Sequence, residues 1–493
     1  MMNHASNVEV LLAEGHELSQ IGRFAEAEAN NRAVLATDPN HPLAQNNLGW
    51  TRQMQGDTDG AIVCYQMALR LDPGLRIARR NLASLLVHSG RGQSDESLQL
   101  FSEELLSGPQ GQVWLRRLAS TAMADRDLTL AGEYAAILAG LRWGGDWYPR
   151  RAEGVLPRLP IEPDQVFVTI PKLMHDIEQF SYLQRIGVLG SAFSEVIAAY
   201  QEVIARLSEP GMPPRLPLEG ELQEMIGYVF NRIVHVRHTP RMDRALSTAW
   251  DAAAAERRYL DQPPGVVVID GFLSEGALEN LRRFCLESTV WSGNRYAHGR
   301  LGAFFHDGFN CPLLLQIAEE LRTAFPRMIG DQYPLRQLWG FKNGADLPGD
   351  STTHADFAAV NVNFWITPDT ANMDPGGGGL VVYAVDAPRH WDFNMYNSSP
   401  DIIKAFLQRQ QAHRMIIPYR QNRAVIFNSD LFHATSALRF RPGYENRRVN
   451  VTMLYGDRED DVHHRQLARP DPTDASAGRA AAWRSGAFGR RRC

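Results

Sequence analysis

Three residues in the second half of the chain could together hold a metal ion. His354 and Asp356 lie in a His-Ala-Asp tripeptide directly before the run FAAVNVNFWIT, and His433 follows the run RAVIFNS. On an extended strand, residues two apart point to the same face, so one short segment can donate both an imidazole and a carboxylate. Two imidazoles and one carboxylate on one side of a metal leave three positions open, which suits non-haem Fe(II) oxygen chemistry.

The tripeptide alone is a weak signal, because about one such tripeptide is expected by chance in a chain with 15 histidines. The sequence does contain a second one, His390-Trp-Asp392. A buried histidine paired with an aspartate is also a common arrangement in a core that holds no metal. The residue types alone are therefore compatible both with a metal site and with a buried His–Asp pair that is hydrogen-bonded and binds no metal.

The segments around these residues are short β-branched runs separated by Gly, Pro and Asn, which predict a β-sandwich or barrel. After His354 come an extended strand, a Gly-rich turn into GLVVY, a strand that ends near His433, and a last strand, RVNVTMLY. This order resembles the double-stranded β-helix (jelly roll, cupin-like) of the 2-oxoglutarate- and Fe(II)-dependent oxygenases, and is closest to their prolyl-hydroxylase-like branch. The resemblance covers about Gly265 to Gly456.

The resemblance implies a metal site with an adjoining co-substrate site. Fe(II) would be bound by His354, Asp356 and His433, and 2-oxoglutarate would chelate it through its 2-oxo-acid end. The planar guanidinium of Arg448 would hold the distal carboxylate through two parallel hydrogen bonds. Dioxygen would take the last position, and a C–H bond of the substrate would be hydroxylated. The carboxylate of Asp356 argues against the halogenase variant, in which a smaller residue makes room for chloride.

Alternation along the last strand selects the residues that share a face with Arg448. Asn450 and Thr452 point to the same side as Arg448, whereas Arg447 faces away. Thr452 is therefore a further candidate for the co-substrate pocket. The spacing of 15 positions from His433 to Arg448 is longer than is usual in the family, and predicts a loop before the last strand.

The strand VNVNFWIT adds two candidates to the co-substrate pocket. Asn363 and Trp365 share a face by the same alternation, and in the family this face lines the pocket. Core packing explains Trp365 equally well. The run Gly376–Gly379 is interpreted as a tight turn, because no Lys-Ser/Thr and no helix follow it as in a phosphate-binding loop. His390 falls where the family has a variable loop, and is expected at the surface.

The first third of the chain repeats with a period of 34 residues, which relates Pro39 to Pro73 and Gly15 to Gly49. This pattern resembles the tetratricopeptide repeat, in which small residues mark helix crossings and a proline ends the second helix. Residues 1–140 are therefore predicted to form an α-solenoid of helix pairs. Such a stack presents a groove, which is typical of modules that bind a protein or peptide.

Three further segments follow the repeats. Residues 141–262 are predicted to be a linker and a helical connector, in which His175 and Asp176 are interpreted as structural or interface residues. Residues 263–457 form the β-rich oxygenase-like domain with flanking helices, and 458–493 a mobile tail. The fold class is thus multidomain α + β.

The composition argues against several classes of protein, namely nucleic-acid-binding, membrane-spanning and secreted proteins. A net charge of −5 over 493 residues argues against a nucleic-acid partner. No run approaches the ~20 apolar residues that span a bilayer, and no signal peptide is evident. Four cysteines without CxxC spacing fit a reducing cytoplasm. The oligomeric state stays open.

Three functional classes remain from the sequence. The first is a hydroxylase of a protein or peptide that the repeats recruit, by analogy with known polypeptide hydroxylases. The second is an oxygenase of a small metabolite that uses the repeats for docking or oligomerisation. The third is a scaffold that is not an enzyme and has a metal-free β-domain.

Overall fold

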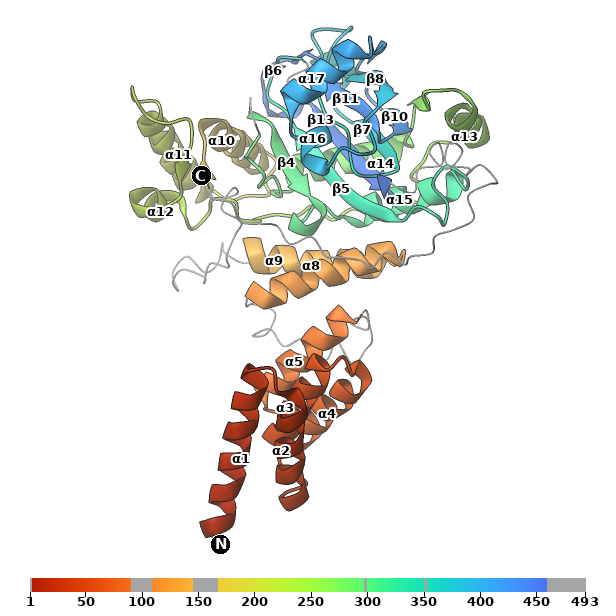
Figure 1. The fold of residues 1–493 in the computed structure, drawn as a ribbon. Helices are drawn as coiled ribbons and strands as arrows, with labels where there is room; N and C mark the ends of the chain where they lie inside the picture. The colour runs from red at the N-terminus through yellow and green to blue at the C-terminus, as the bar shows by residue number, and fades with distance from the viewer. Residues whose placement is uncertain (1, 90–108, 145–166, 297–298, 350–352, 459–493) are drawn as a thin grey trace, which may run out of the picture.

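The computed structural model describes residues 2–89, 109–144, 167–296, 299–349 and 353–458. Within these residues, a helical N-terminal region is followed by a β-rich C-terminal region with helices around it (Figure 1). The predicted fold class is confirmed. Most of the predicted linker and of the C-terminal tail lies outside the described residues.

Five helices make up the first part of the repeat region. They are α1 (Met2–Gln20), α2 (Phe24–Thr37), α3 (Pro42–Met54), α4 (Thr58–Leu71) and α5 (Arg76–His88). The repeat period reflects close helix packing at small residues. A Cβ atom on Gly49 would lie 2.8 Å from the ring of Tyr65, and Ala27 and Ala61 are completely buried. Asp57 caps the start of α4 by accepting a hydrogen bond from the amide of Gly60.

A second helical hairpin consists of α8 (Pro109–Ala124) and α9 (Leu128–Trp143). In Figure 1 it lies between the repeat helices and the β-rich region. The hairpin shares one hydrophobic core with the β-rich region, and its buried Arg142 forms an ion pair with Asp307. The indole of Trp143 donates to the same carboxylate over 3.0 Å. The hairpin is thereby fixed to the β-rich region by packing and by a buried charge pair.

The β-rich region is built on a six-stranded antiparallel sheet in the order β3-β10-β7-β13-β5-β4. These strands are β3 (Val266–Asp270), β4 (Leu301–Phe304), β5 (Leu335–Lys342), β7 (Val360–Trp365), β10 (Arg423–Asn428) and β13 (Val449–Tyr455). Residues that alternate along β13 face opposite sides, so Val451 and Met453 join the apolar core on the outer side. The inner side faces a second sheet.

The second sheet has the order β11-β8-β9, with β8 (Leu380–Asp386), β9 (Arg414–Ile417) and β11 (Leu431–Thr435). The short pair β6 (Asp346–Leu347) and β12 (Leu438–Arg439) forms a ladder of its own. Apolar side chains from both sheets, such as Val382 and Phe427, form a core between them. The two facing antiparallel sheets form the predicted jelly roll.

Helices cover both sheets from outside. The six-stranded sheet packs on α14 (Glu275–Glu287) and α15 (Pro312–Ala324), and α13 (Ala252–Asp261) leads into β3. The short helices α16 (Phe393–Asn397) and α17 (Pro400–Arg409) cover the three-stranded sheet. Among the described residues, short 3₁₀ turns lie at Phe305–Asp307, Asp369–Ala371 and Tyr444–Asn446.

The connector has an apolar core of its own. It comprises α10 (Ile170–Arg185), α11 (Phe193–Leu207) and α12 (Gly220–Ile226), with the two-residue strands β1 (Phe167–Val168) and β2 (Leu216–Pro217). Thr169 is the N-cap of α10, and its hydroxyl accepts a hydrogen bond from the backbone amide of Lys172. The apolar spacing that predicted helices in this segment is confirmed.

Charged side chains are buried where α10 meets the β-rich region. The ammonium of Lys172 lies 2.6 Å from the carboxylate of Asp176, which also contacts the imidazole of His175 at 2.9 Å. Burial, together with the positive charges of Lys342 and Arg447, lowers the pKa of His175 well below its ordinary value. His175 and Asp176 are thus interface residues, as the sequence-based interpretation expected.

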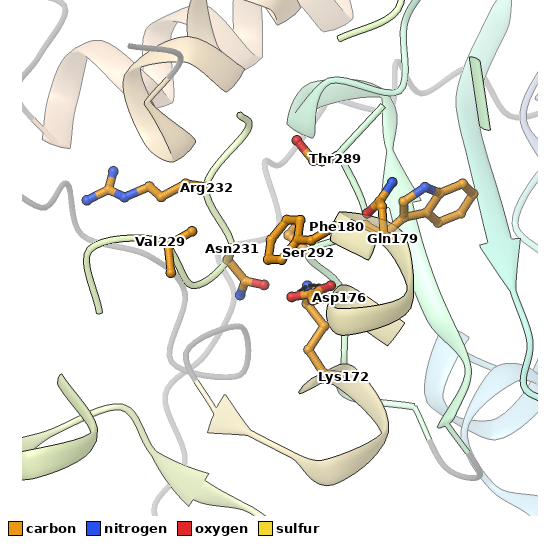
Figure 2. A pocket seen from close by; sticks show the side chains of 10 residues that line it. Lys172, Asp176, Gln179, Phe180, Val229, Asn231, Arg232, Thr289 and Ser292 are labelled. Carbon is orange, nitrogen blue, oxygen red and sulfur yellow. Dashed lines mark hydrogen bonds and ion pairs between the residues drawn. The ribbon is translucent and has the colours of Figure 1, made fainter. Parts of the chain in front are cut away.

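Figure 2 shows the side chains of Lys172 and Asp176 at a small cavity beside Asn231 and Phe180. The space measures about 10 Å³, which is at most enough for one water molecule. It cannot take an organic ligand, so this cluster joins two parts of the fold and is not the chemical site.

Within the described residues, no helix is long and apolar enough to cross a membrane. Cys64, Cys285 and Cys311 are buried free thiols, and Cys493 lies outside the described residues.

Candidate metal centre

The two histidines of the candidate metal site come from neighbouring strands of backbone. His433 lies on β11, and His354 forms an isolated antiparallel bridge with it. Each backbone amide donates to the other residue's carbonyl, over 3.0 and 2.8 Å. Asp356 follows two residues later, and its amide donates to the carbonyl of Ser429 over 3.1 Å. Backbone hydrogen bonds therefore fix the positions of all three residues.

The three side chains converge. One potential ligand atom from each of His354, Asp356 and His433 lies within 4.8 Å of the other two. The Nε2 atom of His433 is 3.4 Å from one carboxylate oxygen of Asp356, and the Nε2 atom of His354 is 3.7 Å from the other. Ligand atoms at ~2.1 Å from one metal and at right angles to each other lie about 3 Å apart. The observed spacing needs only small side-chain adjustments to reach that geometry.

Neighbouring groups orient two of these side chains. The Nδ1 atom of His433 lies 3.0 Å from the carbonyl oxygen of Leu431, an acceptor that favours the tautomer with hydrogen on Nδ1 and a free lone pair on Nε2. The amide of Asn361 donates to Asp356 over 2.7 Å. Hydrogen bonds of this kind from outside the ligand set hold metal ligands in their working orientation.

The electrostatics keep Asp356 ionised. Burial alone would raise the pKa of this carboxyl, but its polar neighbours His433, His354 and Asn361 outweigh burial and lower the pKa. Asp356 and His433 are buried, whereas the side chain of His354 is 28% exposed. A charged carboxylate is the form that binds a cation, and the exposed histidine marks the side open to solvent.

Arg448 is buried on the inner face of the six-stranded sheet without a carboxylate partner. Its Nε donates to the carbonyl of Gly378 over 2.5 Å and its Nη1 to Asn450 over 3.0 Å. The guanidinium also lies over the rings of Trp365 and Tyr419, at 5.6 and 5.9 Å. None of the described acidic side chains forms an ion pair with it.

Burial lowers the pKa of Arg448 to about 9. A buried cation whose partners are all neutral is costly, because its loss of hydration is not repaid by a counter-charge. The side chain thus carries a positive charge into the interior between the two sheets with no described negative charge beside it.

A continuous row of hydrogen-bonded side chains connects this arginine to the metal centre. The row runs across β13 and β7 in the order Arg448, Asn450, Thr452, Asn363, Asn361 and Asp356. The hydroxyl of Thr452 donates to Asn363 over 2.8 Å. Each member of the row is at least 90% buried, so the interior between the two sheets is polar along this line.

The structure brings the other sequence-predicted residues to this region. Asn363 and Thr452 are members of the polar row, and Trp365 packs in the apolar core with its ring beside Arg448. Arg447 faces away and forms an ion pair with Glu178 of α10, at 2.7 Å.

Two residues near the site were not selected from the sequence. Asn361 shares a face with Asn363, so alternation could have found it, whereas Tyr419 follows β9 without a pattern that marks it. The competing tripeptide does not join this cluster: His390 is exposed in a turn beyond β8. The glycines Gly376–Gly379 form the predicted turn before β8.

Residues 12–76 match the tetratricopeptide repeat family, which confirms the repeats predicted there. No curated protein matches the chain. Among solved structures it is similar to the non-haem α-ketoglutarate-dependent carbocyclase SnoK from nogalamycin biosynthesis, with 14% identity, 47% of this chain and 98% of that one covered, and a TM-score of 0.30. It is also similar to the non-haem α-ketoglutarate-dependent epimerase SnoN from the same biosynthesis. The two share 15% identity, 48% of this chain and 95% of that one are covered, and the TM-score is 0.30. A third similar structure is the type III secretion translocator chaperone SycD of Yersinia enterocolitica. It shares 17% identity with this chain, 28% of this chain and 92% of that one are covered, and the TM-score is 0.19.

Proposed function

We propose that this chain is a 2-oxoglutarate- and Fe(II)-dependent dioxygenase that hydroxylates a C–H bond of a protein or peptide recruited by the repeats. One observation supports the proposal above all others. Two histidines and an aspartate converge within 4.8 Å, and a row of hydrogen bonds connects them to a buried arginine that has no described acidic partner.

The donor set fits the proposed metal. Two imidazole nitrogens and one carboxylate on one side of an ion leave positions for a bidentate co-substrate and for dioxygen, as in non-haem Fe(II) oxygenases. A structural zinc site is closed by four protein ligands, and the cluster has only three His, Asp, Glu or Cys side chains among the described residues. When bound, iron with 2-oxoglutarate supplies the oxidation of an unactivated C–H bond by dioxygen.

The protein's own groups perform binding and orientation. His354, Asp356 and His433 hold the metal, and Arg448 binds the far carboxylate of the co-substrate. Asn363, Trp365 and Thr452 line the path between them: the two polar groups hydrogen bond along it, and the indole excludes water on the apolar side. The co-substrate is thereby held at both ends, which is the arrangement that positions its 2-oxo-acid end on the metal.

The repeats support the choice of a polypeptide substrate. Tetratricopeptide helices pack only on their neighbours and present a groove that takes peptide segments. The α8–α9 hairpin packs on the β-rich region, which places a helical module directly beside the domain that holds the metal centre (Figure 1).

The proposal is tested with the full-length chain under anaerobic conditions. Fe(II) and 2-oxoglutarate are added, and the charge-transfer absorption of their complex is recorded; succinate formation is then measured in air. His354→Ala should abolish both signals. His390→Ala, in the exposed second tripeptide, is the matched control and should leave both unchanged.

The substrate class is tested by incubating the active protein with proteins captured on the His354→Ala variant. We expect one captured protein to gain the mass of one oxygen atom. Equal metal binding by His354→Ala and the wild type would refute the ligand assignment. Succinate formation driven only by small metabolites would favour the small-molecule oxygenase.

A further inference from the structure

A second largely buried arginine lies at the same end of the jelly roll as Arg448. Arg300 directly precedes β4, at the edge of the six-stranded sheet, and its side chain reaches the three-stranded sheet. Its Nη2 donates to the hydroxyl of Thr435 over 3.1 Å, and its Nε lies 3.3 Å from the side-chain oxygen of Asn343. Thr435 is two residues from His433 on β11, so the two side chains share a face.

Arg300, like Arg448, has no acidic partner among the described residues. The two guanidinium groups are close enough that the charge of Arg300 adds to the lowering of the pKa of Arg448. Asn343 lies between their strands, and its backbone amide donates to the carbonyl of Arg448 over 2.9 Å. The side chain of Asn343 is 1% exposed, yet its amide nitrogen has no hydrogen-bond partner. The guanidinium groups of Arg300 and Arg448 and the unpaired amide nitrogen of Asn343 therefore lie in the same part of the interior.

The charges of the proposed centre do not account for Arg300. Fe(II) carries two positive charges, of which Asp356 neutralises one. The two carboxylates of 2-oxoglutarate neutralise the other and the charge of Arg448. One positive charge, that of Arg300, is left over; its side chain is only partly exposed to water, so hydration offsets only part of the cost of leaving the charge unpaired. A single additional anionic group would balance it.

Aromatic side chains beside Arg300 form a partly exposed surface. Its guanidinium lies 5.1 Å from the ring centre of Phe341, and the Phe341 ring is 4.9 Å from Tyr296, 6.4 Å from Phe304 and 6.4 Å from Trp339. All four rings keep part of their surface accessible. We name these four residues the aromatic row.

Strand pairing places the aromatic row over the co-substrate path. Trp339 of β5 pairs with Thr452 of β13, which pairs in turn with Asn363 of β7. Phe304 of β4 pairs with Trp339. Paired residues point to the same side of a sheet, so the aromatic row faces the same interior as the polar row that ends at Asp356.

We propose that Arg300 and the aromatic row bind the molecule that is oxidised, and that this molecule carries a carboxylate next to an apolar or aromatic body. The carboxylate takes the place beside Arg300 and the amide of Asn343, and the body lies on the aromatic row. The carboxylate belongs to a small acid or to an acidic residue in a peptide. This inference rests on the proposed function, because it assigns Arg448 to the co-substrate.

The test compares acids with their uncharged amides by calorimetric titration of the full chain, with and without Mn(II) and 2-oxoglutarate. The small-molecule probes are 3-phenylpropanoate and 3-phenylpropanamide, and the peptide probes are acetyl-Phe-Glu-amide and acetyl-Phe-Gln-amide. In wild type the acid of at least one pair should bind roughly 10- to 100-fold more tightly than its amide, as for a charge-assisted hydrogen bond. The pair with the larger preference identifies the source of the carboxylate.

Three variants complete the test. Arg300→Gln should remove the preference for the acid, and Arg300→Lys should keep part of it, because it retains the charge. Arg439→Gln changes an exposed arginine on β12 and should behave as wild type. Equal binding of acid and amide by wild type, or an unchanged preference in Arg300→Gln, would refute the inference.

The co-substrate titration separates this inference from the proposed function. If Arg300→Gln weakens the binding of 2-oxoglutarate and leaves the probes unchanged, Arg300 belongs to the co-substrate site and the inference is wrong. If wild type does not bind Mn(II) and 2-oxoglutarate, the proposed function fails. A preference for the acid that depends on Arg300 in the metal-free protein would then still support an anion site at this position.

Discussion

Replacing Arg448 with methionine should separate the stability of the ligand-free protein from its stabilisation by 2-oxoglutarate. Methionine keeps most of the apolar stem and removes the guanidinium. In the ligand-free protein that group is buried with neutral partners only, and burial lowers its pKa from its ordinary value to about 9. A shift of that size corresponds to roughly 5 kcal/mol against the charged form in the folded state.

The substitution relieves that cost but also removes hydrogen bonds. The carbonyl of Gly378 and the side chain of Asn450 each lose a donor, at about 1–3 kcal/mol per buried group. The two effects nearly cancel, so the free energy of unfolding of the ligand-free protein should change by less than about 2 kcal/mol. A decrease of more than about 4 kcal/mol would contradict the view that this arginine is an uncompensated charge.

The bound state should respond much more strongly. Leaving a buried carboxylate without its charged partner costs about 2–5 kcal/mol, which is a weakening of roughly 30-fold or more. At a concentration 100 times its dissociation constant, 2-oxoglutarate stabilises the wild type by about 2.7 kcal/mol, or roughly 5–10 °C for a domain of this size. The same concentration should stabilise Arg448→Met by less than about 1 kcal/mol.

The assay is a thermal unfolding scan with Mn(II), in the presence and absence of 2-oxoglutarate. Arg447→Met is the matched control, since this neighbour faces away and pairs with Glu178 at 2.7 Å. The control should lose some stability but keep the full stabilisation by 2-oxoglutarate. An unchanged stabilisation in Arg448→Met, or an equal loss in Arg447→Met, would refute the assignment of the co-substrate site.

Three other outcomes can be measured on the same protein. Asn361→Ala removes the hydrogen bond to Asp356 and should weaken metal binding roughly 10- to 100-fold in a competition assay with a chelator. Gly49→Ala should lower the melting temperature of the repeat region, because its Cβ would lie 2.8 Å from an aromatic ring, whereas Gly140→Ala in open space should stabilise α9 by about 1 kcal/mol. Burial and two nearby arginines lower the pKa of His306 to about 3, so below pH 6.5 this residue binds fewer protons in the folded than in the unfolded state; in urea unfolding, the stability that the wild type loses between pH 7 and pH 5 should exceed the loss in His306→Gln by about 2 kcal/mol.

The sequence predicts the parts of this protein that follow a period. The 34-residue spacing predicts the repeats, and two-residue alternation places Asn450 and Thr452 on the face of Arg448 and Arg447 on the other. The order of segments around His354 selects it over His390, which has the same local pattern. The repeats and the strand faces are predicted correctly because strand and helix geometry translates position directly into direction.

Other features depend on contacts between segments that have no common pattern. Helix α10 buries Lys172 and Asp176 where it packs on α14 and on the turn Tyr444–Asn446, far along the chain, and no local rule marks a charged helix face as buried. The position of Arg300 depends on the pairing of β4 with the edge of β5, which follows a loop that the sequence alone could not place. In both cases the side chains belong to elements whose partners are set by tertiary packing.

The interior between the two sheets shows why this cluster is better explained by function than by stability. One part is apolar, and residues such as Val382 and Phe427 would allow the remainder to be filled in the same way. The remainder holds an arginine, three asparagines and a threonine instead, in a row that ends at the aspartate. A buried polar row is tolerated only when its members satisfy one another, and it gives little net stability compared with apolar packing. Departures from an apolar core of this kind are expected where a protein binds or reacts. The row runs from an arginine without a described anion to three side chains that could hold a metal, and the proposed function would place the two ends of a chelating dicarboxylate there.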